Sequence, residues 1–106
     1  MAKKKQMPVE FINRMAEVIK LLGNGQRLQI IEFLDINGES AVNDIVEGVG
    51  GSQAAVSQQL NKMRQAGIIS AHRAGRQVFY SIAEIHSVTI IDCIRKKASE
   101  MKIYNG

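Results

Sequence analysis

The sequence predicts a mainly α (α+β) domain of the winged helix-turn-helix type, with about five helices and a two-stranded β-hairpin wing. Apolar residues recur at helical spacing in five segments, and glycine-containing breaks separate the first four of them. The period then changes to that of strands between residues 68 and 82. Two short helices joined by a Gly-rich turn and followed by a basic hairpin are the parts of this fold.

The chain has 106 residues, which is enough for one domain with a modest core. Residues 1–7 are basic and lack the apolar stretch of a secretory signal, so we expect a flexible arm followed by a single domain over residues 8–106. The one cysteine excludes an intrachain disulfide and favours a cytoplasmic protein. No apolar run approaches the roughly 18 residues of a membrane span, so no membrane partner is expected.

Three helices are expected in the first half of the chain. Residues 8–22 begin with a proline suited to a first helical turn, and Asn24 is a plausible N-cap for a second helix over residues 26–36. Ser40 is expected to cap a third, short helix over residues 41–49. The apolar positions expected to face inward in the second and third helices are Leu28, Ile31, Leu34 or Phe33, and Val42, Ile45 and Val46.

The fourth helix, opened by Ser52 and stopped by Gly67, has an unusual outer face. Its buried stripe is predicted to be Val56, Leu60 and Met63, spaced four and three residues apart. The face turned outward is then uncharged and polar, and consists of Gln53, Ala54, Ser57, Gln58 and Asn61. Such side chains can hydrogen-bond to base edges or touch the thymine methyl group in the major groove. The helix start, at Ser52, directs free N–H groups toward a DNA backbone.

Positive charge surrounds this helix. Seven of the ten acidic residues lie between Glu10 and Glu47, and the window from residue 48 to 83 contains no carboxylate. The cations of this window are Lys62, Arg64, Arg73 and Arg76, together with His72. We expect the two on the helix to contact phosphate or acidic neighbours. The two arginines beside the hairpin tip are expected to approach flanking phosphate or the minor groove. The alternative is a solvated basic surface without a partner.

The hairpin is predicted as strands 68–70 and 77–82, and a long helix is predicted over residues 83–104. The first and last helices each carry an apolar stripe longer than a core of this size can cover, which indicates a two-fold homodimer. The residues expected in its interface are Ile12, Met15, Ile19, Val88, Ile91, Ile94 and Met101.

Three segments resemble the ArsR-type (SmtB/ArsR) winged-helix repressors. "LLGNGQRLQIIEFL" is similar to the start of their second helix, "SQAAVSQQLNKMRQAGII" to their recognition helix, and "RAGRQVFYSI" to their wing. The similarity runs from about residue 9 to 95 and includes a Val-Ser-x-x-Leu core and a Gly-Arg-x-x-x-Tyr wing. The resemblance implies a homodimeric repressor of a palindromic double-stranded DNA operator that is released by an effector.

The effector chemistry of the family is only partly matched. Thiol-ligating members carry two cysteines where this chain has Ala41 and Asn43, which are not ligands for soft metals. Members that sense persulfide or oxidants use a cysteine pair, whereas this chain has only Cys93. An intersubunit disulfide or a sulfenic acid at Cys93 is one interpretation, and a small buried residue of the dimer helix is the other.

Zinc-responsive members use an Asp-x-His pattern at the start of the last helix, with two further ligands eleven and fourteen residues after the histidine. The positions that match here are Glu84, His86, Lys97 and Glu100. One histidine and two carboxylates with a lysine form a poor zinc site, so no metal and no cofactor is expected. Glu84 also fits a capping box with Ser81, and Lys97 could form an intersubunit ion pair with Glu84 or Glu100.

The function expected from these observations is sequence-specific DNA binding by a dimeric transcriptional repressor. No nucleophile–base pair, carboxylate pair or phosphate loop indicates an enzyme. Two alternatives stay open: a winged-helix protein-interaction module that does not bind DNA, and a zinc-responsive repressor using the degenerate site. The operator sequence, the regulated genes and the effector do not follow from the sequence.

Overall fold

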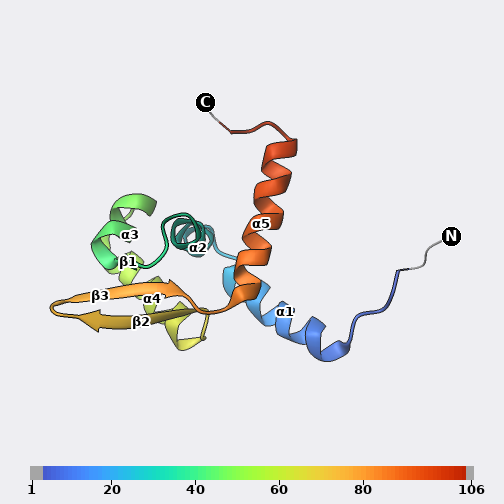
Figure 1. Ribbon diagram of the computed structural model, residues 1–106, viewed down its shortest axis with the longest axis horizontal. Helices are drawn as coiled ribbons and strands as arrows, with labels where there is room; N and C mark the ends of the chain where they lie inside the picture. Colours follow the sequence, from blue (N-terminus) through green and yellow to red (C-terminus); the bar gives the residue numbers. More distant parts are fainter. Residues whose placement is uncertain (1–3, 105–106) are drawn as a thin grey trace.

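The computed structural model describes residues 4–104 and shows five helices with a small antiparallel sheet (Figure 1). The elements are α1 (Val9–Leu22), α2 (Gly25–Asn37), β1 (Ser40–Ala41), α3 (Val42–Val49), α4 (Gln53–Gln65), β2 (Ile69–Ala74), β3 (Gln77–Ile82) and α5 (Ile85–Glu100). This order confirms the predicted succession of four helices, a hairpin and a last helix. No helix in this part of the chain is long and apolar enough to cross a membrane.

The segment before α1 is exposed and forms no regular structure from residue 4 to residue 8. Residues 1–3 of the predicted arm lie outside the described residues. The flexibility of the arm, and the division into an arm and one domain, stay predictions.

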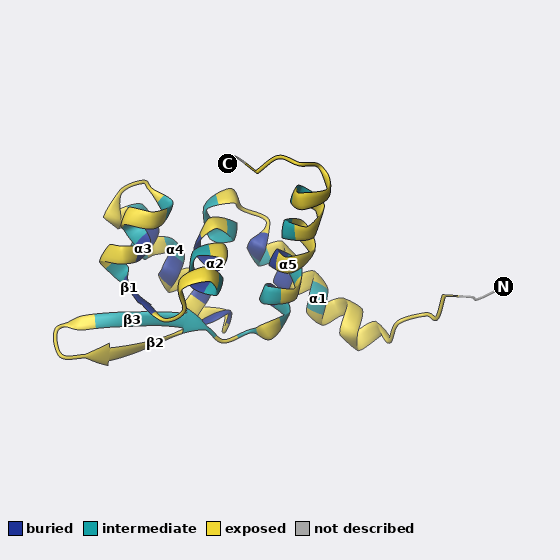
Figure 2. Cartoon of the chain, turned by 45° about the horizontal axis from the view of Figure 1, so that its top comes forward, coloured by how far each residue is buried: buried dark blue, intermediate teal, exposed yellow. Residues whose placement is uncertain are grey.

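The core lies where α2 and α4 meet the start of the hairpin. Ile30, Ile31, Leu60 and Met63 are fully enclosed, and Ile45 of α3 joins them from the side. The predicted stripe Val56, Leu60, Met63 of α4 is therefore confirmed. Figure 2 shows that most buried residues of the helices lie on α2 and α4, whereas α1 is exposed along most of its length.

The sheet has one strand that the sequence did not predict. β1 pairs antiparallel with β3, with Ser40 opposite Tyr80, and the strand order is β1-β3-β2. Ser40 therefore does not cap α3: its hydroxyl donates to the carbonyl of Gly38 at 2.8 Å, and the N-cap position of α3 is Ala41, which has no side-chain bond. The prediction of Ser40 as a helix cap was wrong because a long-range strand pair occupies that residue.

The caps of the second and fourth helices are confirmed. The Asn24 side chain accepts from the backbone N–H of Arg27 at 3.1 Å, and Ser52 Oγ accepts from that of Ala55 at 3.0 Å. Gly67, at φ +79°, reverses the chain after α4, a conformation that favours glycine. These turns fix where α4 begins and how it passes into the wing.

The start of α5 differs from the prediction. The N-cap is Glu84 itself, whose Oε1 accepts from the backbone N–H of His86 at 3.1 Å, while Ser81 lies in β3 and contacts Ser70. The capping box with Ser81 was therefore wrong. Arg14 of α1 forms an ion pair with the other carboxylate oxygen of Glu84, so α1 is tied to the junction between the wing and α5.

The apolar stripes of α1 and α5 are only partly covered within one chain. Ile12, Ile19 and Ile94 are 43%, 55% and 48% exposed, and Met101, beyond the end of α5, is 60% exposed. Met15 and Val88 are half-buried. Ile91 is instead buried in the core of its own chain, at 6% exposure, so its placement on an intersubunit surface was wrong.

A second ion pair joins α5 to α2. Arg95 donates to Asp35 at 3.0 Å and to Asp92 at 2.6 Å. The hydrogen bond that Arg95 donates to Asp35 raises the pKa of the Arg95 guanidinium above its usual value. Arg95 thus stays charged at every physiological pH and holds α5 against the C-terminal half of α2.

Candidate nucleic-acid interface

The outer face of α4 is built by the same periodicity that buries its core stripe. Because Val56, Leu60 and Met63 point inward, the residues between them turn to solvent. Gln53, Ala54, Gln58 and Asn61 are exposed, and Ser57 is half-buried. Four of these five side chains carry a hydroxyl or an amide and none is charged, so the surface presents hydrogen-bonding groups with defined directions.

Asn61 is partly engaged. Its side-chain oxygen accepts from Arg64 one turn later on the same helix, at 2.7 Å. This bond leaves the Asn61 amide NH₂ as its available group and holds the Arg64 guanidinium along the helix rather than away from it. Lys62 and Arg64 are both exposed near the C-terminal end of α4, as expected for cations that contact a backbone.

The wing projects beside this helix. β2 and β3 pair along their full length, from Ile69 opposite Ile82 to Ala74 opposite Gln77, and Gly75 at φ +66° begins the two-residue turn. Arg73 lies at the end of β2 and Arg76 lies in the turn, both exposed. The two arginines therefore stand at the tip, farthest from the core (Figure 1).

The third basic side chain of the wing, His72, contacts an acid from outside the acid-free window. His72 Nδ1 lies 2.9 Å from Glu39 Oε2, and the imidazole stacks on Phe79 with 5.7 Å between ring centroids. This contact connects β2 to the loop before β1. The permanent positive charges of the wing are its two arginines.

A groove of about 330 Å³ connects α4 to the wing. Gln53 and Ser57 line it from α4, Asn43 from α3, and Arg76 and Tyr80 from the wing. No carboxylate is among the described residues that line this groove, so a phosphodiester backbone placed there would meet no like charge. Asn43 and Tyr80 were missed at the sequence level, since only the pairing of β1 with β3 brings them beside α4.

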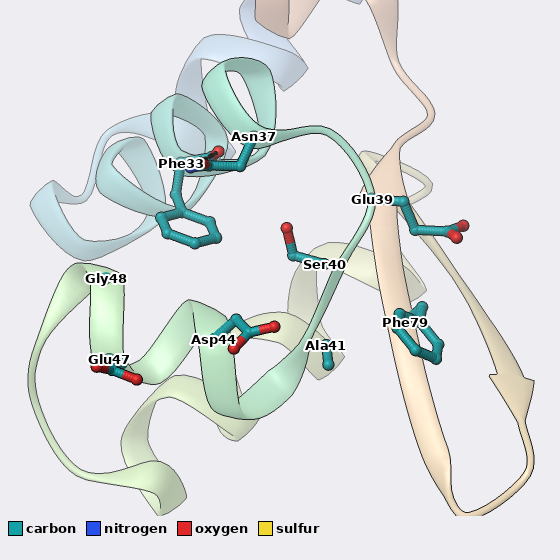
Figure 3. A pocket seen from close by; sticks show the side chains of 9 residues that line it. All are labelled: Phe33, Asn37, Glu39, Ser40, Ala41, Asp44, Glu47, Gly48 and Phe79. Carbon is teal, nitrogen blue, oxygen red and sulfur yellow. Dashed lines mark hydrogen bonds between the residues drawn. The ribbon is translucent and has the colours of Figure 1, made fainter.

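A larger pocket, of about 500 Å³, lies between α2, α3 and the base of the wing and has the opposite character. Asp44 and Glu47 of α3 line it together with the Phe33 ring, and Figure 3 shows that ring pointing toward Gly48. A Cβ at Gly48 would overlap the ring, so a larger residue there would require Phe33 to move. The carboxylates repel phosphate, which limits the candidate DNA surface to the other side of α3.

The candidate metal ligands Glu84, His86 and Glu100 are not brought together in one chain. Glu84 and Glu100 lie at opposite ends of α5, about 24 Å apart at 1.5 Å per residue. Between residues 4 and 104 no three His, Cys, Asp or Glu side chains form a metal-binding group. Glu84 is also engaged by Arg14, so the hypothetical ion pair between Lys97 and Glu84 would have to displace that arginine.

Cys93 is exposed on α5 of the single chain. It is therefore not a buried core residue of its own subunit, and only a partner subunit could cover it. Because the sequence has no second thiol, the redox forms open to Cys93 are a sulfenic acid and a disulfide with a partner subunit. This redox role stays a hypothesis.

The central part of the chain matches a known family. Residues 24–71 match the sequence pattern described as "Bacterial regulatory protein, arsR family". These residues run from the N-cap of α2 into β2 and include the whole of α4.

Individual proteins are similar over a longer range. The HTH-type transcriptional regulator NmtR of Mycobacterium tuberculosis is 35% identical over 79 residues, which cover 74% of this chain and 65% of NmtR, just under two thirds. An uncharacterized HTH-type transcriptional regulator of Methanocaldococcus jannaschii is 31% identical over 81% of this chain and 97% of its own length.

Solved structures have the same fold. The homodimeric winged helix-turn-helix DNA-binding domain of a Mycobacterium bovis protein, a possible ArsR-family regulator, superposes with a TM-score of 0.69 at 30% identity. The match covers 94% of this chain and 92% of that domain. The predicted winged helix-turn-helix architecture is thereby confirmed.

Proposed function

The chain belongs to the ArsR family of bacterial regulatory proteins and is a helix-turn-helix transcriptional regulator, and from this premise we propose that it represses transcription as a homodimer on a palindromic operator. The observation that carries the proposal is the uncharged, hydrogen-bonding outer face of α4, beside an acid-free groove and an arginine-tipped wing. α4 enters the major groove with Gln53, Ser57 and Gln58 at the base edges.

The remaining polar residues position the duplex. Lys62, Arg64, Arg73 and Arg76 approach phosphate or the minor groove, and the N-terminal end of α4 at Ser52 directs its N–H groups toward the backbone. The half-sites lie about one helical turn apart, because two recognition helices related by a two-fold axis must enter successive major grooves on one side of the DNA. The protein acts in the cytoplasm, where its DNA lies, and no catalytic step is part of this mechanism.

Fluorescence anisotropy on duplex DNA from upstream of its own gene tests this function, with a scrambled duplex and a chelator present. We expect tight binding to the upstream duplex and at least a thousandfold weaker binding to the scrambled one. Equal affinity for both duplexes, repeated on other genomic fragments, would instead support the alternative of a winged-helix protein-interaction module.

Excess zinc in the same experiment tests the alternative of a zinc-responsive repressor. Glu84 is engaged by Arg14 and by the start of α5, so we expect zinc to leave the anisotropy unchanged. Release of the duplex by zinc, reversed by chelator, would show that Glu84, His86 and Glu100 suffice when two subunits combine.

A further inference from the structure

A pocket of about 300 Å³ lies between α1, the start of α2 and the end of α4, apart from the candidate DNA surface. Its floor is apolar: Val18 and Ile68 are buried there, with Leu21 beside them. This volume is at the lower end of that of small-molecule sites in proteins, which are mostly apolar with a few fixed polar groups.

The polar groups of this pocket are cationic. Arg14, Lys20 and Arg27 all line it, against a single carboxylate, Glu17, which lies 3.7 Å from Arg14. Because Arg14 is also paired with Glu84, the excess positive charge comes from Lys20 and Arg27. An apolar floor with an excess of positive charge disfavours an amine and leaves a small inorganic anion without apolar contacts. It matches a ligand with an apolar body and one negative group.

Arg27 is the best-defined of the three cations. Its Nε donates to Oε1 of Gln59 at 2.7 Å, and one terminal nitrogen donates to the carbonyl of Leu21 at 3.0 Å. These bonds hold the part-buried guanidinium in one orientation while using two of its five N–H groups. A guanidinium fixed in this way is suited to bind a carboxylate through two parallel hydrogen bonds.

We propose that this pocket binds a small organic carboxylate with an apolar or aromatic body. The apolar body lies on Val18, Leu21 and Ile68, and the carboxylate accepts from Arg27. At 100° per residue, Leu21 lies about 160° from Ile19 around α1 and Val18 about 100°, so the pocket opens on a different side of α1 from the proposed interface.

Occupancy of the pocket acts on α4 through Gln59. A carboxylate bound to the free N–H groups of Arg27 leaves the bond to Gln59 in place and further fixes the guanidinium that attaches α4 to α2. The resulting change in operator affinity rests on the proposed function, whereas binding of the ligand does not.

The test uses 1-naphthoate and its uncharged counterpart 1-naphthylmethanol, titrated into the ¹⁵N-labelled full-length protein and followed by amide chemical shifts. We expect naphthoate to bind with its largest shifts at Val18, Leu21 and Ile68, and the alcohol to bind at least tenfold more weakly. Arg27→Gln should weaken naphthoate binding roughly tenfold, as expected for the loss of a hydrogen bond to a charged group. Lys96→Gln, an exposed cation of α5, should leave it unchanged.

Ala66→Phe gives a second, independent readout, because Ala66 lines the pocket at the exposed end of α4 and a larger side chain there fills it. Failure of naphthoate to bind, equal affinity for the alcohol, or full affinity in Ala66→Phe would each overturn the proposal, even if Arg27→Gln does not fold. Anisotropy on the upstream duplex runs in parallel. Naphthoate binding without DNA binding would support the pocket and overturn the proposed function. DNA binding without naphthoate binding would support the proposed function and overturn the pocket.

Discussion

At the scale of single residues, the choice of bases is expected to depend most on Gln58. It is exposed in the middle of the outer face of α4, and no hydrogen bond to another residue between 4 and 104 holds its amide. A glutamine that bonds adenine with both amide groups contributes about 1–3 kcal/mol of discrimination. We therefore expect Gln58→Ala to reduce the preference for the operator over single-base variants about tenfold, measured by competition anisotropy.

Gln65 provides the matched control for this prediction. It has the same side chain and lies exposed on the same side of α4, but seven residues later, in the last position of the helix and beyond the N-terminal half that is proposed to contact base edges. Gln65→Ala should leave discrimination unchanged. If Gln58→Ala retains both affinity and discrimination, the helix enters the groove in a different rotational register.

Arg76 is expected to act without regard to sequence. It stands at the wing tip and lines the acid-free groove, where a phosphate is the available partner. Arg76→Ala should weaken binding to specific and scrambled duplexes alike, and should lower the slope of log affinity against log salt by about 0.9. Titrations at several salt concentrations measure this, with Lys96→Ala on α5 as control. An unchanged slope would place the wing away from the DNA backbone.

At the scale of elements, the sequence predicted those helices and caps that depend on nearby residues. It did not predict elements that depend on residues far apart in the chain. The stripe of α4 and the caps at Asn24 and Ser52 depend on residues within one or two turns, so the local sequence predicts them. The same local pattern also predicts that the outer face of α4 points to solvent. β1 exists only because Ser40 meets Tyr80, forty residues later, and its own sequence reads as a turn.

The same reasoning explains the junctions that the sequence did not predict. Glu84 caps α5 while paired with Arg14, and no local signal connects residues 70 positions apart. The groove beside α4 and the pocket at Arg27 each combine side chains from several elements, so their geometry follows only from the folded chain. Ile91 illustrates a related limit. Helical periodicity predicts on which side of α5 it lies, but not that the core of its own chain, rather than a partner subunit, covers that side.

The pair of Arg14 with Glu84 is expected to stabilise the junction of α1 with the wing and α5. The Glu84 side chain is 10% exposed, and removing its charge leaves Arg14 without that partner and weakens the cap of α5. Glu84→Gln should lower the free energy of unfolding by about 1–2 kcal/mol, measured by urea denaturation. Glu17→Gln removes the other partner of Arg14, whose side chain is 75% exposed, and should cost close to nothing. Equal effects would show that the Glu84 pair is only a surface contact.

At the scale of the whole molecule, the single chain exposes more surface than its mass requires. Its accessible area is 7607 Å², against about 5,900 Å² for a compact monomer of 11.7 kDa. Part of the excess belongs to the segment before α1 and to the wing. The rest includes the apolar side chains of α1 and α5, which a two-fold partner would cover.

Ile19→Glu tests this interface directly. Ile19 is 55% exposed in the single chain, and a carboxylate there would be buried unpaired in the proposed dimer. We expect sedimentation equilibrium to show a monomer. Operator affinity should fall at least a hundredfold, because one recognition helix contacts only one half-site.

Ile36 of α2 supplies the control for Ile19→Glu. It is 67% exposed and lies outside the stripes of α1 and α5, so Ile36→Glu should remain dimeric with unchanged affinity. A duplex with about five extra base pairs between half-sites places them on opposite sides of the helix and should weaken wild-type binding as strongly as Ile19→Glu does. If Ile19→Glu stays dimeric, or the longer spacing is tolerated, the two recognition helices are not fixed relative to each other by α1 and α5.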